Sequence, residues 1–75
     1  MPTAYVLVNA NIGKEEHCFK ELKNTENIKE IYLLYGFYDL VIIVKANTIK
    51  QLNNSLKKIR QNNNVTKTET MPIIE

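Results

Sequence analysis

The chain has 75 residues, which allows one domain, residues 1–75, with only about 60% of the extended surface buried on folding. Its 44% hydrophobic and 24% charged residues exclude a disordered chain, and no apolar run approaches the roughly 20 residues that span a bilayer. The net charge of +2 is too balanced for a nucleic-acid-binding surface, so direct DNA binding is not expected. One cysteine and no signal peptide indicate a cytoplasmic protein without membrane association.

The first half of the chain predicts a strand, a helix and a second strand. Residues 3–10 are β-forming residues on both faces. Gly13 interrupts this run, and residues 14–23 then predict a helix whose apolar face includes Cys18. After a polar connection, residues 28–35 predict the second strand.

The second half repeats this order. Residues 39–46 predict a strand, and the helix that follows extends to about residue 61 with apolar residues at spacings of three, four and three. Thr48 or Asn47 is the predicted N-cap, and residues 62–64 are expected to end the helix because Asn tolerates the left-handed conformation. Residues 65–74 predict a last strand that is polar on both faces.

This β-α-β-β-α-β order predicts an α+β, ferredoxin-like fold: a four-stranded antiparallel sheet with two helices on one face. In that arrangement the first and third strands are central, and the second and fourth form the edges. The last strand suits an edge, because Pro72 cannot donate a ladder hydrogen bond and Lys67 and Glu69 discourage further pairing.

The predicted strands are apolar on both faces, although two helices can cover only one. Residues 40–44 show no apolar-polar alternation, whereas an antiparallel sheet with a solvated face does. A second copy of the chain is the simplest cover for the other face, giving a dimer of the dimeric α/β barrel type. Burial of about 800 Å² per partner at about 25 cal/mol/Å² would contribute roughly 20 kcal/mol before the costs of association.

No catalytic, metal or cofactor site is predicted. His17 and Cys18 are adjacent, but neighbours on a helix point in different directions, and a buried, inert thiol is the interpretation favoured for Cys18. One His and one Cys cannot supply the four ligands of a zinc site. With only Gly13 and Gly36, the chain has no phosphate-binding glycine-rich loop.

The main functional candidate is the turn between the two middle strands, Tyr35-Gly36-Phe37-Tyr38-Asp39. Gly36 can supply a positive φ. The Asp39 carboxylate in an aromatic setting suits an ammonium group, and backbone N–H groups near Gly36 can receive an anion, so together they suit a zwitterion. In the alternative interpretation, Asp39 only stabilises the turn and the aromatic side chains pack at an oligomer interface.

The motifs and their order resemble the effector-binding domain of the Lrp/AsnC (feast/famine) regulators, also called the RAM domain. Gly36-x-Tyr38-Asp39 resembles its Gly-x-Tyr-Asp signature, and residues 4–9 resemble its first strand. Residues 58–60 resemble the end of its second helix, and Thr68-Glu69-Thr70 its Thr-x-Thr. The resemblance covers essentially the entire chain.

In that family the domain dimerises through its sheet, dimers assemble further, and amino acids or related metabolites bind around the middle hairpin. The resemblance therefore implies ligand-binding roles for the hairpin and weaker ones for the last strand. The implied residues are Tyr35, Gly36, Phe37, Tyr38 and Asp39, with Thr68 and Thr70 as additional polar contacts from the last strand or a neighbouring subunit. Because no helix-turn-helix precedes the first strand, we expect a stand-alone effector domain that acts by co-assembly with full-length regulators.

Two other function classes remain open. One is a small ferredoxin-like dimeric enzyme of the isomerase or monooxygenase type, which requires His17 or Asp39 to face an internal cavity. The other is a structural adaptor whose hairpin aromatics form only a protein interface.

Overall fold

The computed structural model describes residues 1–73, and its six elements follow the predicted β-α-β-β-α-β order. The elements are β1 (Thr3–Ala10), α1 (Glu15–Leu22), β2 (Ile28–Leu33), β3 (Leu40–Lys45), α2 (Ile49–Arg60) and β4 (Val65–Pro72). The sequence predicts a last strand that reaches residue 74, which lies outside the described residues.

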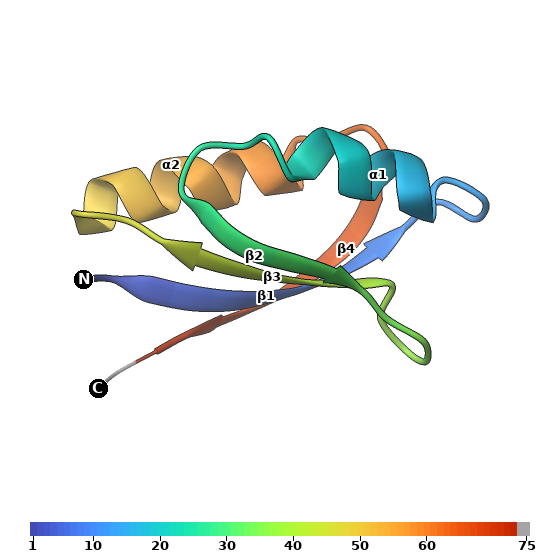
Figure 1. Cartoon of the computed structure of the whole chain (residues 1–75), viewed down its shortest axis with the longest axis horizontal. Helices are drawn as coiled ribbons and strands as arrows, with labels where there is room; N and C mark the ends of the chain where they lie inside the picture. Colours follow the sequence, from blue (N-terminus) through green and yellow to red (C-terminus); the bar gives the residue numbers. More distant parts are fainter. Residues whose placement is uncertain (74–75) are drawn as a thin grey trace.

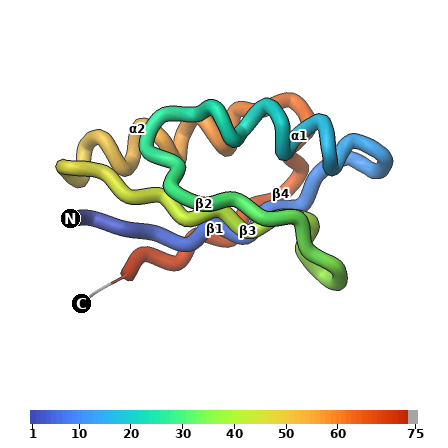
Figure 2. Tube along the Cα trace, in the orientation of Figure 1, coloured from blue at the N-terminus to red at the C-terminus, as the bar shows by residue number. Residues whose placement is uncertain are grey.

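The four strands form one antiparallel sheet in the order β2-β3-β1-β4, so β1 and β3 are central and β2 and β4 are the edges, as predicted. Both helices lie on the same face of this sheet, and nothing within residues 1–73 covers the opposite face (Figure 1). The connection between β2 and β3 projects from one end of the sheet, at the far end from the N-terminus and the end of β4 (Figure 2).

The core lies between the helices and the covered face. Every second residue of β1 from Ala4 to Ala10 is buried, and Leu40, Ile42 and Val44 of β3 lie beside them in register. The helices contribute five further buried apolar side chains, which are Cys18, Leu22, Leu52, Leu56 and Ile59, and Ala46, directly after β3, completes the buried core. Each large side chain buried in this way contributes about 1.5–3 kcal/mol to stability.

The two ends of α2 differ in how well the sequence predicts them. Thr48 caps the start as predicted: its backbone is extended, and its hydroxyl accepts a hydrogen bond from the Gln51 N–H at 3.1 Å. The prediction of a left-handed Asn at the other end is wrong, because the helix ends through a right-handed Gln61 and no residue of 62–64 has a positive φ. The left-handed asparagine is Asn27, with φ 73°, directly before β2.

The uncovered face has an apolar centre. Its apolar residues are Tyr5, Leu7, Tyr32, Val41, Ile43 and Met71. None of them is fully buried, and charged residues such as Lys45 and Glu69 lie on the same face. The side-chain oxygen Oδ1 of Asn9, on the same strand face as Leu7, is buried and has no hydrogen-bond partner within residues 1–73.

Candidate effector site at the β2–β3 hairpin

The hairpin loop consists of residues 34–39 and is closed by one backbone hydrogen bond. The Leu34 N–H donates to the Asp39 carbonyl oxygen at 2.8 Å. Gly36 has φ +119°, a conformation that side-chain-bearing residues rarely adopt, so the predicted positive φ is confirmed.

Asp39 anchors the hairpin to the neighbouring strand β1. Its N–H donates to the Val8 carbonyl at 2.9 Å, and its carboxylate oxygen Oδ2 accepts a hydrogen bond from the Ala10 N–H at 2.8 Å. The turn-stabilising interpretation of Asp39 therefore has a definite geometry. A carboxylate has about four acceptor positions, so one hydrogen bond to Ala10 leaves acceptor capacity for a ligand.

The aromatic residues of the hairpin differ in exposure. Tyr35 and Phe37 are fully exposed, at 106% and 95% of their reference areas, whereas Tyr38 is half-buried. The tip thus presents two aromatic side chains that no other part of residues 1–73 covers. Within one copy they form a projecting surface and not an enclosed pocket.

The two threonines of β4 face the helices. Thr68 lies opposite Val8 and Thr70 opposite Val6, and both valines belong to the core. The Thr70 hydroxyl accepts a hydrogen bond from Arg60 Nη2 at 3.2 Å. Two strand spacings, about 10 Å, separate Thr68 from β3, so the structure does not bring these residues to the hairpin tip of the same chain.

Cys18 and His17 on α1 have the different environments that the sequence predicts. Cys18 is fully buried, and the pKa of its thiol is raised by burial and, less, by the negative charges of Glu21 and Asp39. His17 lies on the solvent side, with Nε2 3.3 Å from Glu21 Oε2. The enzyme hypothesis thereby loses His17 as a base in an internal cavity, while the Asp39 carboxylate accepts a hydrogen bond from the Ala10 N–H.

Two further findings concern only residues 1–73. In this part of the chain, no group of three or more His, Cys, Asp or Glu side chains is placed to hold a metal ion. Both helices of the described chain are also too short and too polar to cross a membrane.

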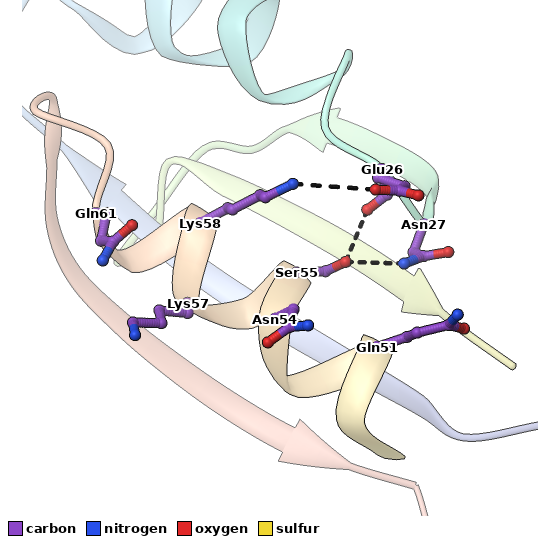
Figure 3. A pocket seen from close by; sticks show the side chains of 8 residues that line it. All are labelled: Glu26, Asn27, Gln51, Asn54, Ser55, Lys57, Lys58 and Gln61. Atoms are coloured by element: carbon purple, nitrogen blue, oxygen red, sulfur yellow. Dashed lines mark hydrogen bonds and ion pairs between the residues drawn. The ribbon is translucent and has the colours of Figure 1, made fainter. Parts of the chain in front are cut away.

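Sequence reasoning missed a buried polar cluster on the helix side. Ser55 is only 2% exposed; its hydroxyl donates to the Glu26 carbonyl at 2.8 Å and accepts from Asn27 Nδ2 at 3.0 Å. The spacing of α2 could have predicted this burial, because Ser55 lies on the apolar face of the helix, three residues after Leu52 and four before Ile59. A buried hydroxyl at such a position requires a hydrogen-bond partner. A hollow of about 310 Å³ lies over this cluster (Figure 3).

Together these features define a ferredoxin-like α+β domain with a half-covered sheet and an anchored aromatic hairpin. Residues 3–75 match the family of the Lrp/AsnC ligand binding domain, and the chain belongs to this family. It is therefore a regulatory ligand-binding domain, as the motifs around the hairpin predict.

Individual proteins show the same relationship. The HTH-type transcriptional regulator FL11 of Pyrococcus horikoshii is 31% identical over 96% of the chain and 48% of its own length. The chain thus spans about half the length of the curated relatives it matches. Among solved structures, hypothetical protein PHS023 of Pyrococcus horikoshii has a TM-score of 0.91 and 36% identity, with 100% of this chain and 92% of that chain covered.

A more distant solved structure shows the same fold. It is the feast or famine regulatory protein from M. tuberculosis, determined in complex with L-methionine. The TM-score is 0.80 at 21% identity, and the match covers 100% of this chain and 51% of that chain.

Proposed function

We propose that this domain binds an amino acid at the β2–β3 hairpin and converts binding into a change of assembly. The observation that carries the proposal is the hairpin itself. Tyr35 and Phe37 are held away from their own chain, while Asp39 fixes the base of the loop to β1. An aromatic tip fixed in this way is suited to close over a ligand that a neighbouring copy holds from the other side.

The chemistry of the tip favours a zwitterion. The remaining acceptor positions of the Asp39 carboxylate suit an ammonium group, and the loop N–H groups around Gly36 suit a carboxylate. Phe37 would contact an apolar ligand side chain. The M. tuberculosis protein of the same fold was determined with L-methionine, an amino acid of this class.

A second copy on the uncovered sheet face is part of the proposal. The apolar centre around Tyr5, Val41 and Ile43 would be buried by self-association, and a polar group of the partner would satisfy Asn9 Oδ1. Replacing Ile43 by Lys would place a charge at this centre and is expected to abolish the dimer in light scattering. The same change at Ile12, which is 98% exposed outside the sheet, is the matched control.

Ligand and assembly are then coupled by mass action. A ligand that binds one assembly better than another shifts the population towards it by its difference in binding free energy. In cells this coupling would act on mixed assemblies with full-length Lrp/AsnC regulators. This role needs no DNA contact by the domain itself.

A thermal-shift screen of the twenty amino acids, with oligomer size measured by light scattering, tests the proposal. At least one amino acid is expected to raise the melting temperature. At a concentration one hundred times its Kd, the ligand would increase the free energy of unfolding by about 2.7 kcal/mol. Phe37→Ala is expected to remove this response without unfolding the chain, because Phe37 packs against almost nothing in its own copy. Ile12→Ala is the control for loss of an exposed apolar side chain.

Two outcomes would contradict the proposal. If no amino acid changes either the melting temperature or the oligomer size, the domain does not sense amino acids. If Phe37→Ala reduces the oligomer in the absence of any amino acid, and no ligand response exists in the parent protein, the hairpin is an adaptor surface.

A further inference from the structure

The hollow lies between α2 and the connection that precedes β2 (Figure 3). Figure 1 shows both segments on the helix side of the molecule, away from the uncovered sheet face and the hairpin. One wall is α2, and the other is the connection between α1 and β2, which contributes Glu26 and Asn27. Its volume of about 310 Å³ equals roughly ten water molecules, which suits a small metabolite and not a macromolecule.

The floor of the hollow is held together by hydrogen bonds. Ser55 binds the Glu26 carbonyl and the Asn27 side chain, so α2 is joined to the connection by two hydrogen bonds. The Asn27 carbonyl in turn accepts a hydrogen bond from the Lys45 N–H at 2.9 Å at the end of β3. A ligand would therefore meet a preformed surface and would not have to order it.

The walls carry uncommitted hydrogen-bond donors. Within residues 1–73, the side chains of Gln51, Asn54 and Gln61 make no hydrogen bond, and Lys57 makes neither a hydrogen bond nor an ion pair. Lys58 reaches across the hollow to Glu26, but the Nζ to Oε1 distance is 3.9 Å. Both side chains are mostly exposed, at 59% and 77%, so this contact is weak and exchangeable.

The charged side chains that line the hollow favour an anionic ligand. Two ammonium groups and one carboxylate line the hollow, and α2 itself carries four basic residues and no acidic one. The donors are spread along the hollow, with Lys57 and Gln61 at one end and Gln51 at the other, while Lys58 spans the middle (Figure 3). An elongated ligand with two negative groups matches this arrangement better than a compact single anion.

We propose that this hollow is a second small-molecule site, specific for a small dicarboxylate. One carboxylate is bound by Lys57 and Gln61. The other takes the place of Glu26 beside Lys58, and the amides of Asn54 and Gln51 donate to its oxygens. The site is independent of the amino-acid site proposed at the hairpin.

The test is a titration of the ¹⁵N-labelled full chain with oxalate, succinate and adipate at constant ionic strength, followed by amide NMR shifts. Succinate or adipate is expected to shift the amides of residues 51–61 and 26–27. Lys57→Met and Lys58→Met are each expected to weaken binding about fivefold, as for exposed ion pairs. Glu26→Gln is expected to tighten binding, because it removes the competing carboxylate.

Lys50→Met is the matched control, because Lys50 belongs to the same helix but does not line the hollow. The proposal is overturned if Lys50→Met weakens succinate binding as much as Lys58→Met. It is also overturned if acetate or inorganic phosphate shifts the same amides with equal affinity, since the hollow would then hold any anion. Phe37→Ala leaves this titration unchanged if the two sites are separate, so the fate of the hairpin proposal does not decide this one.

Discussion

The role of Asp39 as the anchor of the hairpin can be tested by removing its carboxylate. In Asp39→Ala the Ala10 N–H loses its acceptor, and Ala10 itself is only 8% exposed. A hydrogen bond to a charged group contributes about 1.5–3 kcal/mol, and an unsatisfied buried N–H costs about as much. We therefore expect the free energy of unfolding to fall by about 2 kcal/mol.

Asp39→Asn is the matched variant, because its side-chain oxygen can still accept from the Ala10 N–H while the charge is lost. It is expected to retain more than half of this stability. For a domain of this size, about 2 kcal/mol corresponds to a fall in melting temperature of about 8–16 °C. Both variants should be compared with the parent at equal protein concentration, because the proposed oligomerisation would make the melting temperature depend on concentration.

The assay is urea unfolding followed by circular dichroism, with the slope against urea fitted separately for each protein. If Asp39→Ala and the parent differ by less than about 0.5 kcal/mol, which is the usual range for surface substitutions, the anchoring argument is wrong. The hairpin would then be held by its backbone hydrogen bonds alone.

Three further predictions concern the helix side of the molecule. Ser55→Ala leaves the Asn27 amide and the Glu26 carbonyl without their partner. Urea unfolding is expected to show a loss of about 1–2 kcal/mol in the free energy of unfolding. A change within about 0.3 kcal/mol would show that water replaces the hydroxyl. Cys18 is buried and its pKa is raised, so its reaction with a thiol reagent should follow unfolding; rapid labelling of the folded chain would contradict its burial. The pKa of Glu21 is lowered from its ordinary value of 4.5, first by the Asn62 hydrogen bond, so its stabilisation is present above that pH and lost as the pH falls below it. Glu21→Gln should therefore lose less stability on acidification than the parent, and equal loss would exclude this contribution.

The sequence predicts the elements and their order because local patterns decide them. The spacing of apolar residues in α2, the Thr48 cap and the apolar runs of β1 and β3 are each signals of short range, and all are present in the structure. The edge position of β4 follows from Pro72 for the same reason. These features can be predicted without knowing which residues pack against them.

The features that the sequence does not specify depend on side-chain contacts and on strand pairing. The left-handed Asn was expected after α2, but the Asn62 side chain instead accepts from the Asn64 N–H and donates to Glu21 on α1. Likewise, the orientation of Thr68 follows from the pairing of β4 with β1, which its polar sequence does not specify. The hydrogen bond from the Ala10 N–H to the Asp39 carboxylate joins residues 29 positions apart, so the residues of the turn do not indicate it.

If the hairpin binds a ligand as proposed, its geometry makes that function depend on assembly. Small-molecule sites usually bury 70–90% or more of their ligand, whereas a tip with fully exposed Tyr35 and Phe37 covers a ligand from one side only. The missing wall cannot come from Thr68 or Thr70 of the same chain, because these side chains face the helices. A ligand held at the tip would thus need surface from another copy, and its affinity would depend on how those copies are arranged. Under the proposed function, ligand binding and oligomer size are therefore two measurements of a single equilibrium.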